Sequence, residues 1–279
     1  MAQTGVSEMA EVSFQQPTTT DRMVFHLSGT EGTWVRDKVV TEWPLTLYLN
    51  GEEFVTLVAS PDHLDELVTG FLASEGVIQS LDQIRQISFD PETGDARAEL
   101  AVDTAGLKDK LFARRYITSC CGKGRAAIYF DNDYRTAKAV ASDLTVTPGE
   151  AQDLIAKLQE SSDVFRATGG VHNACFATPE EGIWVARSDI GRHNALDKLY
   201  GWSMIHGRDV TQAVVAFSGR VSSEILLKVS KMQIPIVLSK SAPTELALAM
   251  AEDLGITVVG FIRGDRLNVY THVQRVVLA

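Results

Sequence analysis

The sequence predicts an α/β protein with a β-rich, α+β first part and a second part in which strands and helices alternate. In the second part, short apolar segments such as Ile236-Val237-Leu238 alternate with segments of helical periodicity. Consecutive apolar residues are expected where helices cover both faces of a sheet. In the first part, hydrophobic and polar residues alternate between turn residues, which is typical of antiparallel strands.

The composition is that of an ordinary globular protein. The chain has 279 residues, of which 45% are hydrophobic and 22% are charged. Three cysteines are too few for a disulfide framework and fit a reducing compartment. There is no signal-peptide pattern, and no apolar run approaches the ~18 residues that span a membrane. We therefore expect a cytoplasmic protein without membrane contact. The net charge of −10 also argues against nucleic acid as a partner.

The elements of the first part follow from alternation and turn chemistry. Residues 1–21 are polar and are expected to form a disordered tail, and residues 22–145 to form the β-rich part. Asn50-Gly51 predicts a type I′ hairpin turn. A helix is expected after Ser60 as N-cap, with Pro61 at its first position, a core-facing apolar side, and Gly76 just beyond its end. Strands are expected over residues 23–27, 34–40, 45–49, 54–58, 84–89, 96–102 and 126–130.

The second part is expected to span residues 146–279, after a polar linker over 131–146. Thr147 and Glu150 have the spacing of a capping box, which predicts the start of a helix. Strands are expected over 171–178, 183–187, 213–217, 235–239 and 256–262. Helices are expected over 193–206, 222–232 and 243–254.

Polar or charged clusters follow each of the four strands expected from residue 183 onward. They contain five cations, which are Arg192, Arg220, Lys240, Arg263 and Arg266. Ligands of open α/β sheets bind beyond the carboxyl ends of the strands, where helix N-termini expose N–H groups to anions. We therefore expect a site for a phosphate-bearing ligand, although polar loops also join strands in α/β proteins that bind nothing there. The glycine fingerprints of ordinary NTPases and dinucleotide enzymes are absent.

Two of the three cysteines, Cys120 and Cys121, are adjacent in a basic segment with Gly122 and Gly124. The stretch from residue 108 to 125 contains six basic residues and one acid. A nearby cation favours the thiolate, which is the nucleophilic form, and attracts anionic ligands. The alternative is a pair of structural cysteines in a turn.

Two histidines are further candidates for a role in metal binding, ligand binding or acid–base chemistry. His172 and Cys175 could complete a zinc site with Cys120 and Cys121, but adjacent cysteines bind one tetrahedral ion poorly, so we expect no metal. His193 at a helix start is a candidate for a ligand contact or an acid–base role. A structural role for His193 remains open.

These motifs resemble the FdhD family of formate dehydrogenase accessory sulfurtransferases. The most specific run is Asp-Ile-Gly-Arg-His-Asn-Ala-Leu-Asp-Lys at residues 189–198. The similarity extends over about residues 42–275. It includes Cys120-Cys121-Gly122-Lys123, Thr168-Gly169-Gly170-Val171-His172, Ser218-Gly219-Arg220, Ser241-Ala242-Pro243-Thr244 and the segment 260–271.

The resemblance implies a sulfur carrier that accepts persulfide sulfur from a cysteine desulfurase. The sulfur would pass to the molybdenum (or tungsten) bis(molybdopterin guanine dinucleotide) cofactor, as formate dehydrogenase activity requires. It also implies a homodimer and a C-terminal three-layer domain that resembles cytidine deaminases. The residues implied in cofactor binding are Phe261, Ile262, Arg263, Gly264, Asp265 and Arg266, with Ser218, Gly219, Arg220, Arg192 and His193 nearby.

The cysteine motif departs from the family pattern. The family often has Ser-Cys-Gly-x-Cys-Gly, whereas this chain has Ser119-Cys120-Cys121-Gly122-Lys123-Gly124. Cys120 or Cys121 would therefore carry the persulfide alone, which is sufficient for thiol–disulfide exchange chemistry. A chaperone that binds the cofactor without transferring sulfur is the alternative. A deaminase is not expected, because the His-x-Glu and Pro-Cys-x-x-Cys signature is absent.

Overall fold

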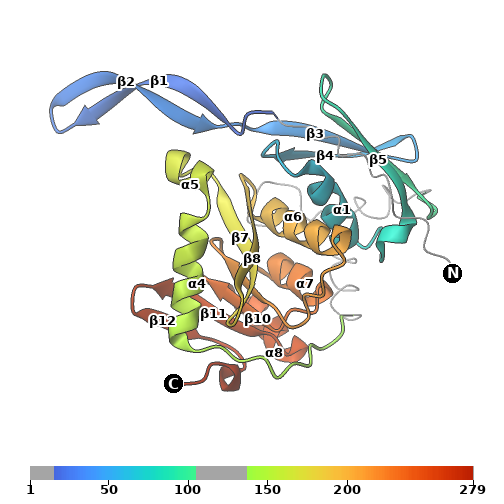
Figure 1. Cartoon of the computed structure of the whole chain (residues 1–279), viewed down its shortest axis with the longest axis vertical. Helices are drawn as coiled ribbons and strands as arrows, with labels where there is room; N and C mark the ends of the chain where they lie inside the picture. Colours follow the sequence, from blue (N-terminus) through green and yellow to red (C-terminus); the bar gives the residue numbers. More distant parts are fainter. Residues whose placement is uncertain (1–15, 105–136, 279) are drawn as a thin grey trace.

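The computed structural model describes residues 16–104 and 137–278, and Figure 1 shows their arrangement. The strands form a six-stranded sheet, a four-stranded sheet and a two-stranded arm. The predicted strand over 126–130 lies outside the described residues. No helix in the described ranges is long and apolar enough to cross a bilayer.

The six-stranded sheet lies in the C-terminal part of the chain. Its order is β12-β11-β10-β9-β7-β8. Strands β9, β10 and β11 are parallel, whereas β7 is antiparallel to both of its neighbours, β8 and β9. The carboxyl ends of β8, β9, β10 and β11 therefore lie at one edge. The strands are β7 (His172–Thr178), β8 (Gly182–Asp189), β9 (Val214–Phe217), β10 (Ile236–Ser239), β11 (Thr257–Arg263) and β12 (Arg266–Val269).

Helices cover both faces of this sheet, so the predicted α/β architecture with three layers is confirmed. On one face, Leu154 and Ile155 of α4 (Pro148–Glu160) pack in a core that contains Ala216 of β9. On the other face, Phe176 of β7 and Phe217 of β9 pack against three helices. These are α6 (Arg192–Ile205), α7 (Ser223–Lys231) and α8 (Glu245–Leu254). The capping box predicted at Thr147 and Glu150 is present at the start of α4.

The four-stranded sheet has the order β4-β3-β6-β5, and α1 (Leu64–Ser74) covers one of its faces. The hairpin turn between β3 and β4 is confirmed, because Asn50 and Gly51 have φ values of 48° and 85°. The strands are β3 (Trp43–Leu49), β4 (Glu52–Ala59), β5 (Ile84–Asp90) and β6 (Asp95–Leu100). A 3₁₀ turn, η1 (Leu81–Gln83), precedes β5, and a second, η2 (Val273–Arg275), lies near the C-terminus.

The end of α1 was predicted correctly and its start was not. Gly76 has φ 73°, its N–H bonds to Ala73 O, and Val77 N–H bonds to Leu72 O, which is a Schellman ending. At the other end, the helix begins at Leu64 with His63 as N-cap, so Ser60 is not a cap. Ser60 instead donates its N–H to Asp189 Oδ2 at 3.0 Å, a contact between distant segments that local sequence cannot reveal.

Four further features of the structure differ from the sequence-based predictions. Strand β1 begins at Thr19, within the segment expected to be a disordered tail. Val140, in the expected linker, is buried in the core beside α8. The sequence also missed β12 and the short helix α5 (Asp163–Thr168). These elements are too short to show a clear period.

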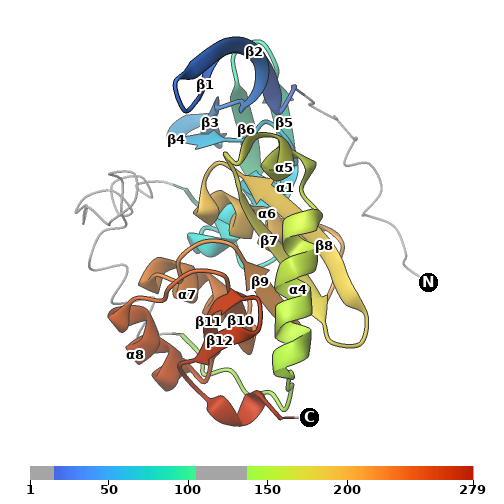
Figure 2. The ribbon, with the colours of Figure 1, turned by 90° about the vertical axis from the view of Figure 1, so that its left-hand side faces the viewer.

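The N-terminal hairpin of β1 (Thr19–Ser28) and β2 (Glu31–Val40) projects from the rest of the molecule (Figures 1 and 2). The two strands pair only with each other in the described structure. At the base of this arm, Val40 lies close to Gly170, which follows α5. The arm therefore contacts the body mainly near its base.

Helices α1 and α6 approach each other closely because each has a glycine at the contact. A Cβ atom at Gly70 would lie 1.8 Å from Asp197 O, and one at Gly201 would lie 1.9 Å from Glu66 O. Neither site has room for any side chain, and both obstacles are backbone atoms. This contact joins the four-stranded sheet and α1 to the C-terminal layers.

We predict that Gly70→Ala lowers the free energy of unfolding by about 3 kcal/mol, because the added methyl group must separate two packed backbones. Urea unfolding followed by circular dichroism measures the change. Gly149→Ala in α4 is the control, since no atom outside its chain neighbours and its own helix backbone lies within 4 Å of the added Cβ. An unchanged urea midpoint for Gly70→Ala would contradict the close helix contact.

Candidate functional site

The structure brings the predicted polar loops together at the carboxyl edge of the six-stranded sheet. A Cβ at Gly219 would lie 3.1 Å from Arg192 Cδ, so the loops after β8 and β9 are in contact. Ser239 Oγ donates to Gly219 O at 2.8 Å, and Phe261 N–H donates to Ser241 O at 3.1 Å. The loops after β8, β9, β10 and β11 thus form one continuous surface. We call it the carboxyl edge.

Arg192 and His193 lie in the first turn of α6, where the helix exposes N–H groups. The N-cap is Gly191, whose N–H donates to Asp189 Oδ1 at 2.8 Å. His193 Nε2 lies 3.2 Å from Glu224 Oε2, on the first turn of α7. Glu224 was not selected from the sequence, because its position beside His193 depends on the packing of α6 and α7.

His172 lies next to the carboxyl edge. From the sequence, this histidine was considered as a zinc ligand. It begins β7, whose amino end lies beside the carboxyl ends of β8 and β9. Ser218 Oγ accepts the N–H of Asn173 at 2.9 Å and lies 3.4 Å from His172 Nδ1. Burial lowers the pKa of His172, and the positive charge of the neighbouring Arg192 lowers it further. The imidazole of His172 therefore favours its neutral form beside Arg192.

The segment Phe261–Arg266 is a β-hairpin, whereas the sequence predicted a charged loop after a strand ending at Ile262. Strand β11 continues to Arg263, which pairs with Arg266 at the start of β12. Phe261 has φ 52° and is 39% exposed, and the Arg263 guanidinium lies 5.8 Å from the centroid of its ring. A positive φ at an exposed aromatic residue is unfavourable and is typical of binding sites.

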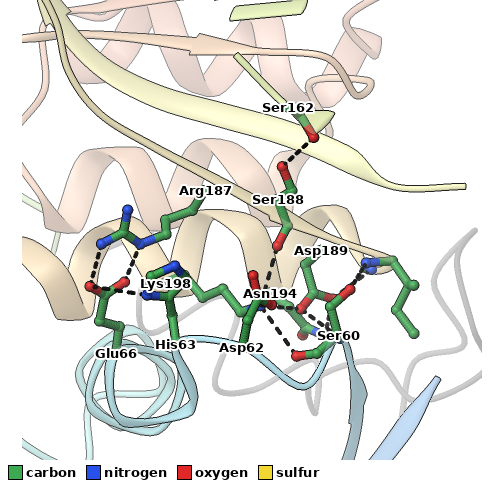
Figure 3. A network of polar contacts seen from close by, with 12 residues as sticks. Ser60, Asp62, His63, Glu66, Ser162, Arg187, Ser188, Asp189, Asn194 and Lys198 are labelled. Carbon is green, nitrogen blue, oxygen red and sulfur yellow. Dashed lines mark hydrogen bonds and ion pairs between the residues drawn. The ribbon is translucent and has the colours of Figure 1, made fainter. Parts of the chain in front are cut away.

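A buried ionic network joins the loop before α1 to the start of α6 (Figure 3). Lys198 Nζ, whose side chain is fully buried, lies 2.7 Å from Asp62 Oδ1 and 2.9 Å from Asp189 Oδ2. It also donates to Ser60 O at 3.3 Å. Asn194 Nδ2 donates to Asp189 Oδ1 and to Val58 O, each at 2.9 Å. The run of residues 189–198 thus positions the first turn of α6.

Two further polar contacts join α1 to the C-terminal layers. Arg187 binds both carboxylate oxygens of Glu66 in a bidentate pair (Figure 3). Lys228 Nζ lies 2.6 Å from Asp197 Oδ1 and 2.7 Å from Ser74 Oγ. The sequence pattern indicates only an apolar face for α1, so the roles of Glu66 and Ser74 were not predicted.

The two members of the His-x-x-Cys motif lie on opposite faces of the sheet. The Cys175 side chain packs on the α4 face, whereas His172 neighbours Ala174 and Phe176 on the α6 face by strand alternation. The two side chains therefore cannot bind one ion. Among the described residues, no cluster of three His, Cys, Asp or Glu side chains could hold a metal.

Of the three cysteines, the structure describes Cys175. Burial raises the pKa of the Cys175 thiol to about 12. This cysteine is therefore a buried core residue with little thiolate near neutral pH. Cys120 and Cys121 lie outside the described residues.

The fold and the carboxyl edge define a three-layer α/β protein with a cationic candidate binding site. The sequence profile described as the FdhD/NarQ family matches residues 40–277. The chain therefore belongs to the FdhD/NarQ family.

Individual relatives agree with this assignment. The chain is 54% identical over 243 residues to the "Sulfur carrier protein FdhD" of Geobacillus kaustophilus, covering 87% of this chain and 91% of that protein. It is 48% identical over 255 residues to the protein of the same name from Bacillus subtilis, covering 91% and 96%. A crystal structure from Desulfotalea psychrophila, assigned as a formate dehydrogenase accessory protein, superposes with a TM-score of 0.76. That match has 25% identity and covers 94% of this chain and all of that one.

We predict that His172 titrates below the ordinary histidine range and that Arg192→Gln raises its pKa, because one of the causes of the depression is removed. NMR titration of the ring protons, assigned with His172→Gln, measures this. Protonation of His172 favours the unfolded state, so its contribution to stability is complete above pH ~6.5 and declines below it.

Arg208→Gln is the control for this titration, since Arg208 pairs with Glu181 and stacks on Trp184. A His172 midpoint that is unchanged in Arg192→Gln would contradict the close placement of these two residues.

Proposed function

We propose that this protein is a sulfur carrier with sulfurtransferase activity. It accepts persulfide sulfur from a cysteine desulfurase and transfers it to the molybdenum bis(molybdopterin guanine dinucleotide) cofactor that formate dehydrogenase requires. The observation that carries the proposal is the meeting of four polar loops at the carboxyl edge of a family member whose relatives are named sulfur carriers. The cofactor is the substrate of this protein.

The carboxyl edge supplies groups that suit the phosphates of the guanine nucleotide arms. Arginines bind phosphates through planar, bidentate hydrogen bonds, and the edge carries Arg192, Arg220, Arg263 and Arg266. The first turns of α6 and α7 add N–H groups and positive potential. Phe261 offers an exposed ring against which a base could stack.

The sulfur step requires one reactive thiol, which we assign to Cys120, with Cys121 as the close alternative. The thiolate attacks the outer sulfur of the desulfurase persulfide, and the sulfur–sulfur bond of the donor breaks. The donor cysteine leaves as a thiolate, and the acceptor holds Cys–S–S⁻, so no external oxidant is needed. The basic residues around the pair stabilise both anions.

The proposed partners are the cysteine desulfurase and the catalytic subunit of formate dehydrogenase, and the proposed location is the cytoplasm. A second candidate function is a chaperone that presents the cofactor without sulfur transfer. The observation that favours it is that Ser119-Cys120-Cys121-Gly122-Lys123-Gly124 departs from the Cys-x-x-Cys pattern of the family. Sulfur stoichiometry separates the two functions.

We predict that incubation with a cysteine desulfurase and L-cysteine adds the mass of sulfur to the intact chain, at Cys120 or Cys121. Cys175→Ala should load as wild type does, whereas a Cys120→Ala/Cys121→Ala double variant should not load. Peptide mapping identifies the site. An adduct on Cys175 alone would overturn the assignment. Absence of any adduct, with cofactor binding retained, would favour the chaperone.

A further inference from the structure

His172 lies between two of the loops that form the carboxyl edge. Strand β7 lies between β9 and β8 and runs antiparallel to both, so its first residue is beside the last residues of these two strands. His172 pairs with Asp189, the last residue of β8, and Asn173 O accepts the N–H of Ser218, which follows β9, at 2.9 Å. A ligand held by the loops after β8 and β9 would therefore approach this imidazole.

The contact between His172 and Ser218 suits both protonation states of the imidazole. Ser218 Oγ lies 3.4 Å from His172 Nδ1 and already accepts the N–H of Asn173 at 2.9 Å. A hydroxyl has one proton to donate and two lone pairs that accept. It can donate to Nδ1 when the ring is neutral, and it can accept from Nδ1–H when the ring is charged. The imidazole can therefore gain a proton without losing this contact.

The surroundings of the imidazole oppose a positive charge in the protein alone. Burial lowers the pKa of His172, and the guanidinium of Arg192, on the first turn of α6, lowers it further. His193, the next residue of α6, has the same effect whenever its own ring is charged, and it lies 3.2 Å from Glu224 of α7. The neutral ring of His172 therefore adds no repulsion to a surface that already carries several arginines.

Asp189 of β8 favours the charged form of His172, but its own charge is largely compensated. Its carboxylate is fully buried, and Oδ2 lies 2.9 Å from Lys198 Nζ. The loop after β9 faces the ring with Ser218, which is uncharged. Among the described residues, the electrostatic field at the imidazole is therefore set mainly by Arg192.

A phosphate bound beside Arg192 would reverse this balance. The guanidinium and the exposed N–H groups of the first turn of α6 are groups to which phosphates bind. The negative charge of the phosphate offsets the positive charge of the guanidinium and favours the imidazolium, which can then donate a hydrogen bond of its own to the ligand. Histidine is the side chain whose charge changes in this way near neutral pH.

We propose that His172 is a phosphate-binding group of the carboxyl edge and takes up a proton when a pyrophosphate binds beside Arg192. This role rests on the proposed function, since the ligand is the guanine nucleotide arm of the cofactor. Binding is linked to protonation, so the affinity increases as the pH falls from the pKa of His172 in the complex to its lower pKa in the free protein. Below both pKa values the ring is charged in both states, and the affinity no longer changes through this group.

The test is calorimetric titration of the full chain with GDP-mannose, a guanine nucleotide whose esterified pyrophosphate does not titrate near neutral pH. Titrations at pH ~6.5, in two buffers with different ionisation enthalpies, give the number of protons taken up per ligand bound. We expect wild type to take up roughly half a proton under these conditions. His172→Gln should take up almost none and bind about 3- to 10-fold more weakly, because glutamine cannot become charged.

His206→Gln is the matched control, because His206 lies at the other end of α6, with Nδ1 2.9 Å from Trp202 O. This variant should take up protons as wild type does. NMR titration of the wild-type ring protons, with and without saturating GDP-mannose, follows His172 without any substitution. We expect the ligand to raise the pKa of His172.

Binding of GDP-mannose to wild type without proton uptake would overturn the proposal. Uptake that persists in His172→Gln would do so too, because it would place the proton on another group such as His193. A pKa of His172 that the ligand does not raise is the third contrary result. In each of these cases the nucleotide still binds, so the proposed function is unaffected. No binding of GDP-mannose by wild type would instead remove the proposed site, and the role of His172 with it.

Discussion

The position of Lys198 between Asp62 and Asp189 is the constraint on which the rest of the structure depends. The lysine and Asp189 side chains are fully buried, and the ammonium lies within 3 Å of both carboxylates. Removing such charges from water costs several kcal/mol per ion, so the arrangement is tolerated only when every partner is in place. Because Asp62 precedes α1 and Asp189 ends β8, α1 and its sheet have one defined position against α6.

The same network also sets the geometry of the carboxyl edge. Asp189 binds Gly191 N–H and the Asn194 side chain, which fixes the first turn of α6 where Arg192 and His193 lie. The contact of Gly219 with Arg192 then extends this order to the loop after β9. The proposed binding surface, although made of separate loops, thus rests on rigid elements, which is what a preorganised phosphate site requires.

Local patterns in the sequence predicted most elements of the fold, including the Asn50-Gly51 turn and the ending of α1 at Gly76. The direction of the strands was enough to predict that the four polar loops meet. The sequence could not predict the contacts made by Ser60, Asp62 and Glu66, because their partners lie more than 100 residues away. It also could not predict that β1 and β2 project from the body, since alternation along a strand does not show what covers each face.

The most direct test of the account is the binding of GDP, a simple probe for the guanine nucleotide arms of the proposed substrate. Calorimetric titration of wild type, Arg263→Ala and Arg266→Ala should show affinity ~10- to 100-fold weaker for each variant, because each loses a charge-assisted hydrogen bond to phosphate. Arg85→Ala, an exposed arginine on β5, should bind GDP as wild type does. Wild-type affinity in both Arg263→Ala and Arg266→Ala would contradict the placement of the site at the carboxyl edge.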